Sequence, residues 1–446
     1  MLSPKTKIAL KSRICIILIQ FLSNLLIPDH DANVFESPVD VDKIKSADWL
    51  VEYVFGGFRR WDAHYFLHIS EHGYTYEHTM AFYPLYPFVI RSITNWILCL
   101  ECISSILSFR SVALLVAITL NTLFFIKAAH MLQNLTNYVF NNNQRQSNRA
   151  VYLFCFNPAS IFFTAPYTES LFAWLTFSVM YNVATNKLNS AILPLCLSIA
   201  CRSNGFINVG FVLYYGFTHA LTINRTSIYK YLFKLLHYFV LILLAILAFF
   251  SIQIYQYSLF CSHYDNKFSY ILIEHAFKNG YVLAGERISS WCTHTVPLAY
   301  SYIQSYYWNV GFMKYYEIHQ IPNFLLALPI LIVFLSNIYK FVRKHRLSLI
   351  KSLFVDSNKQ FVHMVHVTFL TLFSIAFVHI QVTTRLLASA SPCLYWFCTF
   401  SMPTSQNPSM KSYFSNLSLT SKLIVTWFLS YYIIGTILFC NFLPWT

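Results

Sequence analysis

Long continuous runs of apolar residues recur along the whole chain, separated by short polar segments. Each run reaches about 17 to 25 residues, the length that a helix needs to cross the hydrocarbon core of a bilayer. The runs do not alternate between apolar and polar residues as the strands of a membrane barrel do. The pattern therefore predicts an all-α, polytopic membrane protein with about eleven transmembrane helices. The expected spans lie near residues 14–28, 109–131, 150–166, 168–185, 188–202, 204–222, 235–257, 322–340, 361–380, 386–402 and 423–443.

The first apolar run follows a cluster of basic residues: Lys5, Lys7, Lys11 and Arg13. No small-residue cleavage site follows it, so we expect an uncleaved anchor with the N-terminus in the cytosol. Threading the spans alternately also places most basic loops on the cytosolic side. The scheme predicts one transmembrane domain over residues 1–446, with a first luminal loop at residues 29–108 and a second large luminal loop at residues 258–321.

The composition supports a membrane protein and argues against a nucleic-acid-binding protein. Hydrophobic residues make up 57% of the 446 positions and charged residues only 11%. The net charge of +14 does not indicate nucleic-acid binding, because no soluble basic domain exists to carry it and the basic loops account for it. Among 11 cysteines, Cys261 and Cys292 lie in the second predicted luminal loop and could form a disulfide in an oxidising compartment.

Acidic, imidazole and aromatic side chains are concentrated in the first predicted luminal loop, directly after Trp61. Ionisable groups this close to a bilayer are usually functional. Asp62 is the candidate general base, since a carboxylate in a partly dry site can take a proton from a hydroxyl. Asp is also a common N-cap, here of a helix predicted over residues 63–71. The two roles are compatible.

Three histidines, His64, His68 and His72, recur at the spacing of one helical face, with Glu71 beside them. His68, Glu71 and His72 fit the H-x-x-E-H pattern of zinc proteases. A membrane zinc metalloprotease is therefore a rival enzyme, although no third ligand is evident. The other interpretation is that these are interfacial histidines, hydrogen-bonded to backbone or lipid headgroups.

An aromatic and proline-rich segment covers residues 81–87 and includes Tyr83. Its prolines make an ordinary spanning helix unfavourable, so it predicts an interfacial or re-entrant element. Its rings could stack on a sugar or line a polyisoprenoid, and a simple aromatic belt is the default alternative.

Three polar islands lie at predicted luminal span ends: residues 157–170, 202–205 and 381–385. Arg202 and Arg385 are candidate clamps for a lipid phosphate, because a guanidinium binds phosphate oxygens bidentately. Snorkelling, or an ion pair with Glu169, is the alternative for each arginine. A lipid or ion transporter is the non-enzyme rival, but the gathering of the islands on one side favours chemistry at a single surface.

The same residues, taken in order, resemble the phosphatidylinositol glycan class V family, the second mannosyltransferases of GPI-anchor synthesis. The matching blocks extend over nearly the whole chain: Trp61-Asp62, His68-Ile69, Glu71-His72-Gly73-Tyr74, Tyr76-Glu77-His78, Ala81–Pro87, Asn157–Phe163, Tyr167–Phe172, Arg202–Gly205, Gln320–Phe324, Thr384-Arg385, Ser391-Pro392 and Tyr395-Trp396. So many ordered blocks make the resemblance specific.

The resemblance implies a GT-C glycosyltransferase of the endoplasmic reticulum that adds the second mannose, in α1,6 linkage, from dolichyl-phosphate-mannose to a GPI-precursor glycolipid. It places Asp62 at the reaction centre. A single Trp-Asp pair stands where Asp-x-Asp would suggest a metal, so a divalent metal is possible and no cofactor is assigned. The expected partners are the two substrates and the membrane lipid, with room for a small helper subunit. The expected substrate-binding residues are Trp61, His64, His68, Glu71, His72, His78, Tyr83, Glu169, Arg202, Asn204 and Arg385.

Overall fold

The computed structural model describes residues 3–221, 228–262, 268–286, 288–345, 359–402 and 418–445. Within these residues the regular structure is helical, apart from one isolated bridge between Tyr76 and Leu283. Five of the described helices are long and apolar enough to cross a membrane. They are α1 (Pro4–Leu26), α6 (Phe109–Val139), α11 (Ile228–Phe260), α14 (Ile321–His345) and α20 (Leu419–Cys440). The predicted all-α fold of a multi-span membrane protein is therefore confirmed.

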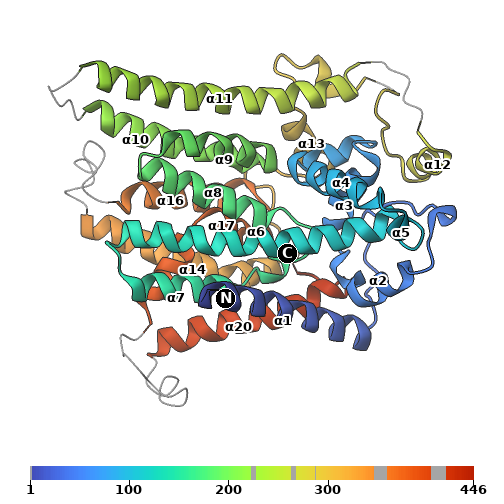
Figure 1. Cartoon of the computed structure of the whole chain (residues 1–446), viewed down its shortest axis with the longest axis horizontal. Coiled ribbons are helices and arrows are strands. Elements are labelled where there is room, and N and C mark those ends of the chain that lie inside the picture. The colour runs from blue at the N-terminus through green and yellow to red at the C-terminus, as the bar shows by residue number, and fades with distance from the viewer. Residues whose placement is uncertain are drawn as a thin grey trace.

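Shorter helices fill the space between the long ones and run along the same general direction (Figure 1). These are α7 (Gln144–Cys155), α8 (Glu169–Ala184), α9 (Leu188–Cys201), α10 (Val209–Leu221), α16 (Phe361–Phe377), α17 (Thr383–Ala390) and α18 (Cys393–Phe400). Helix α8 is buried on nearly all sides, with α6 and α9 among its neighbours. A helix that is apolar all round fits the centre of such a bundle.

The remaining short helices gather at one end of the bundle, on the right of Figure 1, and we call this group the short-helix lobe. It contains α2 (Asp48–Phe55), α3 (Ala63–His72), α4 (Leu85–Leu98), α5 (Glu101–Ser104), α12 (Tyr270–Asn279) and α13 (Ala299–Trp308). The two segments predicted as luminal loops thus lie together. Single 3-10 turns connect many elements: η1 (Val41–Lys43), η2 (Gly56–Phe58), η3 (Glu77–Ala81), η4 (Ser160–Phe163), η5 (Ser203–Asn208), η6 (Ser290–Thr293), η7 (Ile318–Gln320) and η8 (Ile380–Val382).

Two predicted spans are not single helices. In the span expected at residues 150–166, α7 ends before Asn157, whose side-chain amide bonds the backbone on both sides of a turn. Pro158 follows and disfavours a helical conformation at the residue before it. The span expected at residues 386–402 is broken between α17 and α18, where Pro392 again interrupts the helix. The first break lies in the polar island at residues 157–170, and the residues at both breaks, Asn157 and Ser391, are buried, so irregular backbone reaches the interior of the bundle.

Arg13 is fully buried within α1 instead of flanking it. Its guanidinium donates to the main-chain oxygens of Cys155 and Ser160, at 3.0 and 2.8 Å, and to the Thr164 hydroxyl at 3.1 Å. It also lies 3.9 Å from the ring centroid of Phe125. Arg13 therefore satisfies the backbone that the end of α7 leaves open, and it fixes α1 against the bundle.

Two kinds of link hold the second predicted luminal segment in place. A disulfide joins Cys261, just after α11, to Cys292, which confirms the predicted pair. The buried carboxylate of Glu77 accepts hydrogen bonds from Trp291 Nε1 at 3.1 Å and from the Tyr307 hydroxyl at 2.6 Å. The disulfide ties the second luminal segment to α11 of the bundle. The hydrogen bonds of Glu77 tie it to the first luminal segment, which carries α3.

Candidate active site

Asp62 stands at the N-terminal end of α3, directly after a strained residue. Trp61 has a φ of +56°, in the left-handed region that a bulky side chain rarely adopts. Such strain concentrates at functional sites. Asp62 occupies the N-cap position but makes no side-chain capping bond, so its carboxylate is not used by the helix. Its backbone N–H donates to the Tyr167 hydroxyl at 3.0 Å.

The backbone just before the acid is held by Arg60. This buried guanidinium donates from Nε to the main-chain oxygen of Cys440 at 3.0 Å and from Nη2 to Asn24 Oδ1 at 3.0 Å. Nη2 also pairs with Asp29 Oδ2 at 2.8 Å. Arg60 therefore links the start of α3 to the ends of α1 and α20, which fixes the position of the acid relative to the spanning helices.

The Asp62 carboxylate forms an ion pair with Arg385 on α17. Asp62 Oδ2 lies 2.8 Å from Arg385 Nη2, and the two side chains are 32% and 12% exposed. The guanidinium carbon of Arg385 lies 5.2 Å from the ring centroid of Phe162 and 5.4 Å from that of Tyr167. Aromatic faces stabilise a guanidinium in this position. The Asp62 carboxylate is therefore partly exposed to solvent, while the Arg385 guanidinium is held against two aromatic rings.

A second ion pair involves Glu169, at the start of α8, and Arg202. Glu169 Oε1 lies 2.5 Å from Arg202 Nη1, and the two side chains are 1% and 17% exposed. Arg202 also donates to the Thr168 hydroxyl at 3.4 Å. The ion pair considered for Arg202 is therefore present. It is more deeply buried than the pair made by Asp62.

Several polar atoms around the two pairs are buried and have no hydrogen-bond partner within the described part of the chain: Trp61 Nε1, Arg385 Nε, Glu169 Oε2 and Asn204 Nδ2. Buried polar groups are normally satisfied, so such orphans need a reason. Three of these atoms are in N–H groups and one is a carboxylate oxygen. A polar ligand with both hydroxyls and anionic oxygens could satisfy them.

The three histidines of α3 do not form a ligand set. Both ring nitrogens of His68 are engaged, with the Ser37 hydroxyl at 2.7 Å and the Thr75 hydroxyl at 2.6 Å. His72 lies 3.7 Å from Glu71, and burial lowers the pKa of His72 to about 4. Among the described residues, no group of three His, Cys, Asp or Glu side chains could hold a metal ion. This geometry does not support a zinc protease.

Other predicted site residues lie away from the acid. Glu71 is at the far end of a ten-residue helix, which corresponds to about 14 Å along the axis from Asp62. Burial raises the pKa of Glu71. His78 is buried in an aromatic cluster, and Tyr83 packs its ring 5.7 Å from that of Tyr300. Glu71 belongs to the short-helix lobe, and His78 and Tyr83 lie between its helices α3 and α4; in the described part of the chain none of the three pairs with Asp62 or Arg385.

His64 is the predicted histidine nearest to the acid along α3. It is buried, and its ring stacks 6.2 Å from the ring of Phe442. Burial, followed by the charge of Arg59, lowers the pKa of His64 to about 3. A neutral imidazole here can donate or accept a hydrogen bond but carries no charge.

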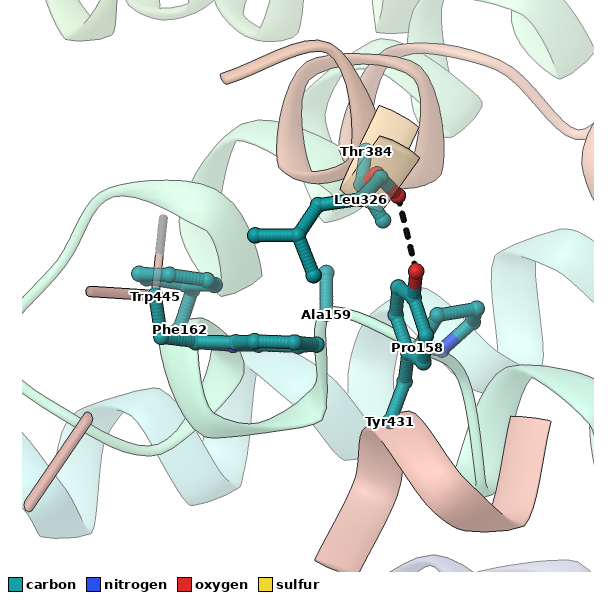
Figure 2. Close-up of a pocket in the computed structure, with 7 residues that line it drawn as sticks. All are labelled: Pro158, Ala159, Phe162, Leu326, Thr384, Tyr431 and Trp445. Carbon is teal, nitrogen blue, oxygen red and sulfur yellow. Dashed lines mark hydrogen bonds between the residues drawn. The ribbon is translucent and has the colours of Figure 1, made fainter. Parts of the chain in front are cut away.

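Figure 2 shows an apolar pocket whose lining includes Thr384, the residue before Arg385. It is lined by Pro158, Ala159, Phe162, Leu326, Thr384, Tyr431 and Trp445. Thr384 precedes Arg385, and Phe162 belongs both to this pocket and to the rings beneath the guanidinium. The Tyr431 hydroxyl donates to the main-chain oxygen of Leu326 at 2.8 Å and so joins α20 to α14 across the pocket.

Three residues that build this site had no role assigned to them from the sequence. Tyr167 contacts the Asp62 backbone and the Arg385 guanidinium, Phe162 supports the same guanidinium, and Arg60 anchors the loop. Tyr167 and Phe162 lie in the polar island at residues 157–170. Their position in this polar island could have marked them as site residues, but it could not show that they support the Arg385 guanidinium.

Comparison with known proteins identifies the family. The model of the mannosyltransferase (PIG-V) family matches residues 4–446. The chain belongs to this family. A GPI mannosyltransferase 2 of Drosophila melanogaster is 38% identical over 462 residues, covering 99% of each chain. The GPI alpha-1,6-mannosyltransferase 2 of Homo sapiens is 35% identical over 489 residues, covering 99% of this chain and 98% of that one.

Membership of the PIG-V family makes the chain a mannosyltransferase, which confirms the predicted enzyme class and the resemblance. Among solved structures, the apo oligosaccharyltransferase of Archaeoglobus fulgidus aligns with 97% of this chain and 56% of its own, with a TM-score of 0.47 and 13% identity. The protease and transporter alternatives have no support from these matches.

Proposed function

We propose that this protein transfers the second mannose, in α1,6 linkage, from dolichyl-phosphate-mannose to the growing GPI precursor. The names of its full-length relatives support the acceptor and the linkage. Arg385, which follows Thr384 of the apolar pocket and lies over Phe162 of its lining, supports an anionic lipid carrier as donor. The reaction takes place at the luminal face of the endoplasmic reticulum, with residues 29–108 and 258–321 luminal and the N-terminus cytosolic. A small membrane helper subunit stays a prediction.

The Asp62–Arg385 pair is the observation on which the mechanism depends. Asp62 takes the proton of the acceptor O6 hydroxyl while that oxygen attacks the anomeric carbon of the donor. The bond from this carbon to the phosphate oxygen breaks on the opposite face, and its electrons leave with dolichyl phosphate. One displacement therefore converts a β-linked donor into an α-linked product.

The departing phosphate gains charge and needs electrostatic stabilisation more than a proton. Arg202 and Arg385 are the candidates, since both guanidinium groups lie at the site. Trp61 Nε1 and Asn204 Nδ2 are buried N–H groups without a described partner, which suits them to sugar hydroxyls. Glu169 is the partner of Arg202, and the remaining predicted substrate contacts lie in the segment of α3 to α4.

Complementation of cells that lack the second GPI mannosyltransferase tests this proposal. The wild-type chain should restore GPI synthesis, whereas Asp62→Asn should accumulate single-mannose GPI precursors, because an amide keeps the shape but cannot accept the proton. Asp42→Asn is the matched control, since Asp42 is an exposed acid in the same predicted luminal segment. Full rescue by Asp62→Asn would remove the base assignment, and failure of the wild-type chain would remove the acceptor assignment.

A further inference from the structure

The two arginines of the site are not equivalent. Arg202 is paired with Glu169, whose side chain is only 1% exposed, whereas Arg385 is paired with Asp62, whose side chain is 32% exposed. Breaking the first pair would leave an uncompensated charge in the interior, which is strongly unfavourable. Breaking the second pair lets the carboxylate return to water. An incoming anion can therefore replace Asp62 far more readily than it can replace Glu169.

Arg385 also has an unused hydrogen-bond donor. Its Nε is buried and has no partner among the described residues, although a guanidinium carries five N–H groups in a fixed fork. Its edge thus offers one free buried N–H besides the group bound to Asp62. This is the donor geometry that phosphate oxygens match bidentately.

We propose that Arg385 binds the donor phosphate and that Asp62 occupies this guanidinium in the empty enzyme, so that carboxylate and phosphate compete for one cation. The inference rests on the proposed function. In the empty site the pair keeps both groups compensated. When the donor binds, its phosphate takes over Arg385, and Asp62 is released towards the acceptor hydroxyl.

The negative charges of the donor phosphate and of Asp62 change in opposite directions during the transfer. The donor phosphodiester carries one negative charge, which becomes two when the bond to the anomeric carbon breaks. Asp62 loses its negative charge at the same time, because it accepts the hydroxyl proton. The total charge of the site is unchanged, but the phosphate on Arg385 gains one negative charge, so the guanidinium stabilises the leaving phosphate more strongly than the bound donor.

The test measures binding of farnesyl phosphate, a short polyprenyl phosphate, to the purified full-length protein in detergent. Asp62→Asn should bind it about three- to thirtyfold more tightly than the wild type, because a competing and repelling carboxylate is gone. Farnesol should bind both proteins equally, since it lacks the phosphate. Adding Arg385→Gln to Asp62→Asn should abolish the gain.

Unchanged or weaker binding by folded Asp62→Asn, judged by gel filtration, would overturn the proposal. So would tighter binding by Glu169→Gln alone, because that result would assign the phosphate to Arg202. Transfer of mannose from dolichyl-phosphate-mannose by the wild type is measured separately. If the wild type transfers mannose but Asp62→Asn does not bind farnesyl phosphate more tightly, only the competition for Arg385 is rejected. If farnesyl phosphate binds as expected but the wild type transfers no mannose, the proposed function is rejected.

Discussion

Glu77 connects two segments of the short-helix lobe, and its replacement by alanine should loosen their junction. The carboxylate accepts hydrogen bonds from Trp291 at 3.1 Å and from Tyr307 at 2.6 Å. Truncation would leave both donors without an acceptor, and each buried orphan costs about 1 to 3 kcal/mol. Trp291 is fully buried, but Tyr307 can partly rehydrate. We therefore expect Glu77→Ala to lower the free energy of unfolding by about 2 to 4 kcal/mol.

Thermal unfolding of the purified protein in detergent measures this effect. Glu77→Gln should cost less, about 1 to 2 kcal/mol, because the amide oxygen can still accept from Trp291 while its NH2 group can donate to a rotated Tyr307 hydroxyl. Glu274→Gln is the matched control, since Glu274 is an exposed acid on α12 in the same lobe. It should change stability by no more than about 0.5 kcal/mol.

One outcome would refute the reasoning. If Glu77→Ala melts with the wild type while Glu274→Gln does too, the two hydrogen bonds do not hold the junction together. If instead both variants melt early to the same extent, the effect reflects acidic charge on the lobe and not the buried contacts.

Two further predictions concern a close backbone contact and a buried histidine. Gly205→Ala should destabilise the protein by about 1 to 3 kcal/mol or more, because a Cβ would overlap the Ser198 main chain. Gly210→Ala should be tolerated, since there is open space where its Cβ would lie, and melting curves compare the two variants. Burial lowers the pKa of His78 to about 3, so the unfolded chain binds the extra proton below pH 6.5 and stability falls as the pH drops from there towards 3. His78→Phe should remove about 2 kcal/mol of the stability loss seen at pH 5, and an unchanged pH profile would contradict this.

Much of the fold could be predicted because its signals are local. Apolar run length predicted the long helices, and the Asp at position 62 correctly marked the start of a helix. The sequence also allowed a disulfide between Cys261 and Cys292, since both thiols lie in one predicted loop, and the structure contains it. The breaks in two predicted spans were missed because the apolar runs continue through Pro158 and Pro392, although the helices end there.

The sequence raised an ion pair with Glu169 for either arginine, but it could not show which arginine forms that pair or that Asp62 pairs with the other. Arg202 and Arg385 have the same side chain and similar polar surroundings in the chain, yet one pairs with a buried acid and the other with a partly open one. This difference depends on how α8 and α17 pack against the start of α3. Periodicity placed His64 and His68 on one face but could not show that hydroxyls occupy both nitrogens of His68.

The buried Arg13 has a consequence for how the chain is made. Its main-chain acceptor at Ser160 lies 147 residues further along the sequence. At about 5 to 20 residues per second, the ribosome needs roughly 7 to 30 seconds to deliver that acceptor after Arg13 has emerged. During this interval Arg13 lacks the acceptors that follow α7, so α1 cannot reach its final packed position until those later residues arrive.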